Sequence, residues 1–176
     1  LHQRYILTGG PGAGKTTVID LLSLRGYRCI PDHARMIIQE RKAKGLSPRP
    51  APSEFGNATL DMDIEAFEET REHHGPVFYE RGIFDSLYSR YKRGDITPSD
   101  LEQYKVDYPY NPTVFFFPPW AEIYVQDAER DHTFEHAVMV GNITVDWYQE
   151  LGFNVLEVPK LPPGQRMKFI LAEIPK

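Results

Sequence analysis

The chain has little cysteine, no long hydrophobic run and no excess of basic charge. Cys29 is the single cysteine among 176 residues, which excludes an internal disulfide. It lies in an apolar stretch, residues 27–30, so we expect a buried strand thiol in a reducing compartment. No apolar stretch approaches the roughly 20 residues that a membrane-spanning helix needs. No charged and then apolar signal segment opens the sequence, so we expect a cytoplasmic location and no membrane span.

The charge balance also limits the kinds of ligand that we expect the protein to bind. The formal net charge is −5 and the sequence pI is near 5.7, which argues against a broad basic face and therefore against stable binding of nucleic acid. Small anionic ligands fit this balance better. With 41% hydrophobic and 26% charged residues, the chain can bury a core, and we expect one domain spanning residues 1–176. The sequence does not indicate an oligomeric state.

Short apolar runs alternate with longer amphipathic stretches, which predicts βαβ units around a buried parallel sheet and hence an α/β fold with helices on both faces. Five strands are expected, at residues 4–8, 27–30, 77–79, 114–117 and 154–158. Seven helices are expected, at residues 15–24, 33–44, 53–73, 83–93, 98–105, 132–151 and 163–174. The proline-rich segment 45–52 is expected to be a loop.

Residues 9–17 contain the most specific motif, Gly-Gly-Pro-Gly-Ala-Gly-Lys-Thr-Thr, between the first strand and the first helix. Glycines let backbone N–H groups surround a polyphosphate, and the helix N-terminus favours an anion. Lys15 is expected to reach the β- and γ-phosphates, and the Thr16 hydroxyl to hold Mg²⁺. The expected nucleotide-binding residues are Gly10, Pro11, Gly12, Ala13, Gly14, Lys15, Thr16 and Thr17. The bland alternative is a glycine-rich turn without a ligand.

Two further polar blocks follow the second and third strands, where an open parallel sheet places its ligand crevice. Asp32 and Arg35 can face this crevice, with Asp32 as a general base or as a ligand to a Mg²⁺-bound water; its alternative role is a helix N-cap. Glu80 can serve the metal, and Arg81 can clamp an anionic group or the transferring phosphoryl. The alternative for Glu80 and Arg81 is a surface ion pair of little energetic value.

A charged stretch, residues 118–131, follows the fourth strand. It can form a lid, residues 118–132, in which Arg130 stabilises charge in a transition state. From the spacing alone, a solvated loop with self-paired charges is favoured.

The phosphate loop, the blocks 31–35 and 78–82, and the stretch from 118 to 130 together resemble a family of predicted ATPases filed under the AAA name. Its members are closer in pattern to P-loop nucleoside and nucleotide kinases than to AAA+ motors. The block 31–35 is also similar to the acceptor region of ribosylnicotinamide kinase domains. The resemblance implies a P-loop NTPase three-layer sandwich with sheet order 2-3-1-4-5. The resemblance also favours the interpretation of Arg130 as a lid residue. It places Asp32 at a position where the family usually has Glu.

Together these patterns predict a P-loop enzyme that uses Mg²⁺ and ATP, with GTP possible in its place. The favoured function is a small-molecule kinase with a nucleoside- or nucleotide-like acceptor, in which Lys15, Asp32, Arg81 and Arg130 are catalytic. Asp32, Arg35, Glu80 and Arg81 are expected to bind the acceptor, and Thr16 and Glu80 the metal. The alternative is a nucleotide-dependent switch or ATPase that acts through a protein or lipid partner.

Overall fold

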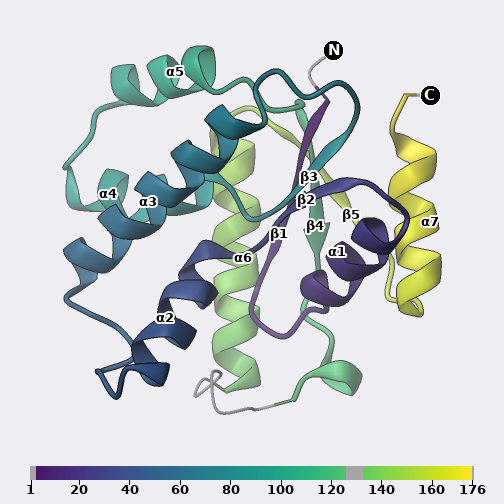
Figure 1. Cartoon of the computed structure of the whole chain (residues 1–176), viewed down its shortest axis with the longest axis horizontal. Helices are drawn as coiled ribbons and strands as arrows, with labels where there is room; N and C mark the ends of the chain where they lie inside the picture. The colour runs from purple at the N-terminus through teal and green to yellow at the C-terminus, as the bar shows by residue number, and fades with distance from the viewer. Residues whose placement is uncertain (1–2, 126–132, 176) are drawn as a thin grey trace.

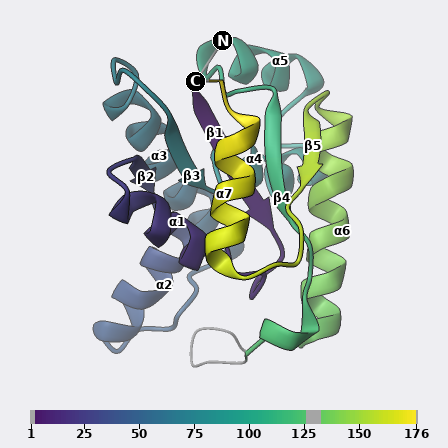
Figure 2. The same ribbon diagram turned by 90° about the vertical axis from the view of Figure 1, so that its right-hand side faces the viewer.

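Five parallel strands form the centre of the protein, and helices cover both of their faces (Figures 1 and 2). The computed structural model describes residues 3–125 and 133–175. The strands are β1 (Arg4–Gly9), β2 (Arg28–Ile30), β3 (Val77–Glu80), β4 (Thr113–Phe117) and β5 (Asn154–Glu157). The helices are α1 (Lys15–Leu24), α2 (His33–Ala43), α3 (Pro52–Glu69), α4 (Ile83–Arg93), α5 (Pro98–Asp107), α6 (Phe134–Glu150) and α7 (Pro163–Glu173), with a 3₁₀ turn, η1, at Ala121–Ile123.

Strands β1, β3 and β4 contain continuous apolar runs because they bury side chains on both faces of the sheet. In β1, Tyr5 and Leu7 enter the core beneath α1 and α7, whereas Ile6 enters the core on the opposite face. In β3, Phe78 faces the first core and Tyr79 the second. This alternation follows from the two-residue period of a strand. A strand covered on both sides therefore appears in the sequence as a continuous apolar run.

The helices divide between the two faces according to their apolar residues. One core joins the strands to α1 and α7, through residues such as Leu22 and Ile170. The other joins them to α3, α4, α5 and α6, through residues such as Phe67, Leu87 and Trp147. Figure 2 shows α1 and α7 together in front of the sheet, with α6 beyond β5. The resulting three layers are those of a doubly wound α/β protein.

The strand order is β2-β3-β1-β4-β5, and all four pairings are parallel, as the family resemblance implies. Leu7 pairs with Glu80 and Ile30 with Tyr79, so β1, β2 and β3 end side by side. The loops that follow these strands begin helices α1, α2 and α4. The sheet therefore brings the phosphate loop and the two polar blocks to one edge.

Each expected strand and helix is found, and most of them have one or both ends shifted by one to four residues. Helix α3 ends at Glu69 rather than at residue 73, because the Thr70 hydroxyl donates to the carbonyls of Ala66 and Phe67 and closes the last turn. Helix α6 begins at Phe134 with Thr133 as its N-cap; residue 132 lies outside the described residues. Cys29 is half-buried rather than buried, because β2 is an edge strand. No helix within residues 3–125 and 133–175 has the length and apolarity needed to cross a bilayer.

Candidate functional site

The loop between β1 and α1 has a backbone that only glycine adopts easily. Gly12 and Gly14 have φ values of 76° and 84°, in the left-handed region, and Gly14 is the N-cap of α1. A Cβ atom at Gly10 would lie 2.4 Å from the carbonyl oxygen of Ala137. The glycine pattern is therefore required by the path of the chain. The same path leaves the N-terminus of α1 facing the crevice, where backbone N–H groups and the helix dipole favour an anion.

Lys15 is folded back on the loop. Its Nζ atom donates to the carbonyl oxygens of Gly9 and Gly10, at 3.1 and 3.0 Å, and the residue is only 5% exposed. Burial and, to a smaller extent, the charge of Arg81 lower the pKa of Lys15 to about 8, against the opposing effect of Glu80. A phosphate can take the place of the two carbonyl oxygens that now bind the ammonium group. Its negative charge would favour the protonated form of Lys15, which burial disfavours.

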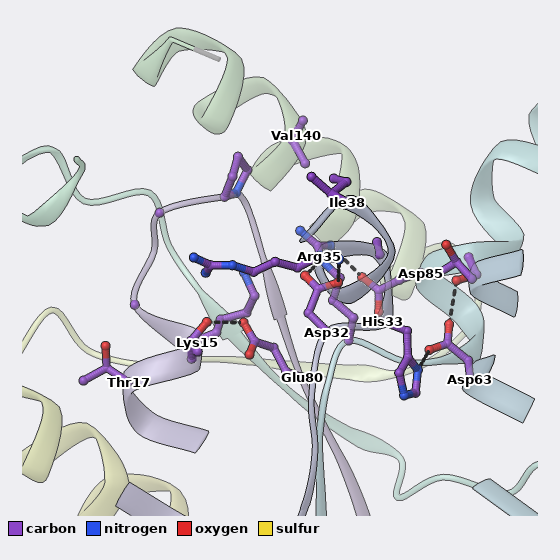
Figure 3. Close-up of a pocket in the computed structure, with 18 of the residues that line it drawn as sticks. Lys15, Thr17, Asp32, His33, Arg35, Ile38, Asp63, Glu80, Asp85 and Val140 are labelled. Carbon is purple, nitrogen blue, oxygen red and sulfur yellow. Dashed lines mark hydrogen bonds and ion pairs between the residues drawn. The ribbon is translucent and has the colours of Figure 1, made fainter. Parts of the chain in front are cut away.

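Thr16 and Glu80 meet at the ends of α1 and β3. The Thr16 hydroxyl donates to Oε1 of Glu80 at 2.7 Å, and Figure 3 shows Glu80 next to Lys15. Burial raises the pKa of Glu80, although the nearby charge of Lys15 lowers it. A hydroxyl and a carboxylate are oxygen ligands that suit Mg²⁺, so this pair fits the metal. Among the described residues, no group of three or more His, Cys, Asp or Glu can hold a metal, so a cation here would need oxygens from a nucleotide or from water.

Arg81 is bound by two carboxylates, and Glu80 is not one of them. Its Nε atom donates to Oδ2 of Asp32 at 3.2 Å, and Nη1 donates to Oδ1 of Asp85 at 3.1 Å. Nη2 donates to the carbonyl oxygen of Gly9 at 3.0 Å. Arg81 has a φ of 67°, the only left-handed value at a non-glycine position among the described residues. This backbone costs on the order of 1 kcal/mol or more, and it turns the guanidinium back over the end of β1.

Asp32 is both an N-cap and a partner of Arg81. Its Oδ1 atom accepts the backbone N–H of Arg35 at 3.1 Å, which caps α2, while Oδ2 accepts from Arg81. A carboxylate can accept about four hydrogen bonds, so these two contacts leave lone pairs that face the crevice. The N-cap alternative and the functional interpretation are therefore compatible in one side chain.

A cavity of about 910 Å³ connects these groups. Most of the expected site residues line it: Pro11, Gly12, Gly14, Lys15, Thr16, Thr17, Asp32, Arg35, Glu80 and Arg81. Gly10 and Ala13 are buried in the loop behind its wall. Arg130 lies outside the described residues, as does the part of the expected lid from 126 to 132. Of the rest of that segment, Trp120, Ile123 and Val125 line the cavity.

Asp85 is a site residue that the sequence analysis missed. Besides Arg81, it accepts the hydroxyls of Thr8 and Tyr148, both at 2.6 Å, and the backbone N–H of Gly82 at 3.1 Å. It therefore joins β1, α4 and α6 beneath the crevice. The sequence signal was weak, since an acid in the first turn of a helix is ordinary.

Arg166 was also missed. It comes from α7, is 4% exposed, and donates through Nη1 to the carbonyl oxygen of Ala13 at 2.9 Å. Its guanidinium lies between the rings of Phe117 and Trp120, at 5.7 and 5.6 Å from their centroids. It thus supports the phosphate loop and also lines the cavity. Nothing in its local sequence separates it from a surface arginine.

A further polar group lies at the other end of the cavity. Nδ1 of His33 lies 2.7 Å from Oδ1 of Asp63, and the hydroxyl of Ser86 donates to Oδ2 of Asp63 at 2.6 Å. All three residues line the cavity. Burial raises the pKa of Asp63, while the hydrogen bond from His33 opposes the shift. An acid on the buried stripe formed by Thr59, Asp63 and Ala66 was the available signal in the sequence.

Comparisons with known proteins agree with this fold. The family profile described as an AAA domain matches residues 4–166. A search of curated proteins finds no match. Among solved structures, the chain is similar to deoxyadenosine kinase from M. mycoides, with a TM-score of 0.61 and 11% identity, over 98% of both chains. It is similar to thymidylate kinase from Candida albicans, with a TM-score of 0.67 and 12% identity, over 97% of this chain and 90% of that one. Shikimate kinase from Aquifex aeolicus gives a TM-score of 0.55 and 17% identity, over 96% and 94%. At these identities the likeness shows a P-loop kinase fold.

Proposed function

The chain belongs to the AAA domain family, and from this membership and its kinase fold we propose that it is a small-molecule kinase. The proposed reaction transfers the γ-phosphoryl group of Mg²⁺-ATP to a hydroxyl of a nucleoside- or nucleotide-like acceptor. The observation that carries the proposal is the continuity of one cavity of about 910 Å³ from the phosphate loop to the pocket between α2, α3 and α4. Its volume lies near the upper end of the roughly 300 to 1,000 Å³ that ligand pockets span, and its lining continues past the phosphate loop to residues of α2, α3 and α4.

In this proposal the loop of residues 10–17 holds the polyphosphate, and Lys15 leaves the carbonyls of Gly9 and Gly10 to contact the β- and γ-phosphates. Thr16 and Glu80 hold Mg²⁺, since their oxygens already lie within hydrogen-bonding distance. When bound there, Mg²⁺ would supply positive charge that offsets the charge developing on the phosphate oxygens. GTP fits the same phosphate contacts, and we assign ATP from the family.

The proposed role of Asp32 is to orient the acceptor hydroxyl and to accept its proton. Its two existing contacts fix the carboxylate in place without using all of its lone pairs. Arg81 lies beside it and offsets negative charge, and Arg35 binds the acceptor from the same cavity. We propose from the family resemblance that Arg130 offsets charge on the transferring group.

The test is ADP release by the purified protein with Mg²⁺-ATP across a library of nucleosides, nucleotides and sugars, with Lys15→Ala as the blank. We expect one acceptor class to stimulate ADP release strongly in the wild type and not in the variant. Unchanged nucleotide binding and turnover in Lys15→Ala would contradict the assignment of the site. Slow hydrolysis that no acceptor stimulates would instead favour a nucleotide-dependent switch that acts through a partner.

A further inference from the structure

The end of the cavity farthest from the phosphate loop is walled by three helices. Helix α2 contributes His33, α3 contributes Asp63, and α4 contributes Ser86. Apolar and small residues surround this polar group: Ile38, Phe55, Gly56, Thr59 and Ser89. In Figure 3, Lys15 and Glu80 lie on one side of Asp32, and His33 and Asp63 lie on the other. A ligand whose reacting hydroxyl approaches Asp32 therefore extends toward His33.

The hydrogen bonds of Asp63 fix the orientation of the His33 ring. Asp63 is 7% exposed and His33 is 7% exposed, so water does not compete strongly for either side chain. An ionised Asp63 carboxylate accepts from the hydroxyl of Ser86 through one oxygen and from Nδ1 of His33 through the other. A neutral imidazole that donates through Nδ1 presents a lone pair at Nε2.

This lone pair has no partner in the described part of the protein. The bond to Asp63 is the only hydrogen bond that the side chain of His33 makes there, and the residue lines the cavity. A structural role, in which the cluster only ties α2 to α3 and α4, would be served by Nδ1 alone. The remaining acceptor atom belongs to a residue that lines the cavity, in which the second ligand of a kinase would lie.

We propose that His33 is a specificity-determining residue whose Nε2 accepts a hydrogen bond from a second hydroxyl of the phosphoryl acceptor. The substrate class is therefore a polyhydroxylated molecule, such as a nucleoside, sugar or polyol. A phosphate or carboxylate at this position is disfavoured, since it offers only lone pairs to Nε2 and lies near the Asp63 carboxylate. Asp63 and Ser86 are positioning residues that act through the ring of His33. This inference rests on the proposed kinase function.

The first test compares two amide substitutions at one position. In His33→Asn the amide N–H still reaches Asp63, but the group at Nε2 is removed. In His33→Gln the amide extends one bond farther and restores a hydrogen-bond acceptor to the cavity. We expect His33→Asn to raise the KM for the acceptor roughly tenfold, as for one lost hydrogen bond, without a comparable change in the KM for ATP. His33→Gln should recover part of this loss, and the exposed His73→Asn should change neither constant.

The second test removes the partner hydroxyl from the acceptor. For each nucleoside or polyol that stimulates ADP release, the deoxy analogues are assayed with the wild type and with His33→Asn. We expect one analogue to lose roughly tenfold in the wild type but little in the variant, because the bond is already absent there. Equal losses for every analogue in both proteins would overturn the inference and leave the kinase function standing.

A third measurement is independent of turnover and follows the tautomer by ¹⁵N NMR of the histidine rings. In the wild type, Nδ1 of His33 should carry a proton and Nε2 should be bare. Asp63→Asn should weaken this preference, and addition of the library to the ADP-bound protein should shift the Nε2 resonance. A wild-type His33 protonated at Nε2 would overturn the inference. A bare Nε2 whose resonance no library member shifts would also overturn it, whereas the loss of ADP release alone would count against the kinase function.

Discussion

Replacing Asp85 with alanine removes one carboxylate that holds four groups together. The hydroxyls of Thr8 and Tyr148 both donate to it at 2.6 Å, and Arg81 and the backbone N–H of Gly82 donate at 3.1 Å. Thr8 and Tyr148 are fully buried, so water cannot easily take the place of the carboxylate. Each orphaned donor costs about 1–3 kcal/mol, and breaking a buried ion pair costs about 3–5 kcal/mol. These costs overlap, so we expect a loss of about 3–5 kcal/mol for Asp85→Ala.

The assay is urea unfolding of the nucleotide-free protein, followed by circular dichroism. With an m value of about 2 kcal/mol per molar urea, the midpoint should fall by about 1.5 M or more. Asp85→Asn keeps the shape but not the charge, and it should fall between alanine and the wild type. The control is Asp95→Ala, because Asp95 pairs with Arg93 at 2.7 Å on the surface, where such a pair contributes at most about 1 kcal/mol. Equal midpoints for the alanine variants at 85 and 95 would refute this account of Asp85.

Three further predictions concern the phosphate loop and its metal. The pKa of Lys15 in the free protein is about 8, and a phosphate favours the charged form. ATP affinity measured by calorimetry should therefore fall above about pH 8 by at most tenfold per pH unit. In Lys15→Arg the affinity should not change with pH over this range. Glu80→Gln should raise the Mg²⁺ concentration that gives half-maximal turnover by roughly 10-fold or more, and excess Mg²⁺ should restore part of the rate. If the dependence of turnover on Mg²⁺ is unchanged in this variant, Glu80 does not belong to the metal site. Gly9→Ala places a Cβ 2.4 Å from the Phe117 carbonyl oxygen and should cost about 2 kcal/mol or more in unfolding free energy. Gly26→Ala, with a similar positive φ but open space, should cost about 1 kcal/mol.

The architecture could be predicted from the sequence because its determinants are local. The runs around Ile6, Phe78 and Phe115 are buried on both faces of the sheet, which is why they are continuously apolar. The motif from Gly9 to Thr17 encodes its own backbone path through glycines. The strand order depends instead on which strands lie side by side, and it came from the family resemblance.

The site could be predicted only in part, because its remaining contacts join residues that are distant in the sequence. The block around Arg81 indicated a charged partner, but the neighbouring Glu80 is bound to Thr16, whereas the carboxylates on Arg81 come from Asp32 and Asp85. The bond of His33 to Asp63 spans 30 residues. Such pairs follow from the packing of helices against one another, which no local pattern encodes.

The central claim, phosphoryl transfer to a small molecule, is tested most directly by following the γ-phosphoryl group itself. ATP labelled with ¹⁸O on the γ-phosphoryl group is incubated with Mg²⁺, the purified protein and the library of acceptors, and the products are separated by mass spectrometry. The account predicts that the label appears on an organic acceptor and that Lys15→Ala abolishes its transfer. Label found only in inorganic phosphate, with every acceptor present, would contradict it.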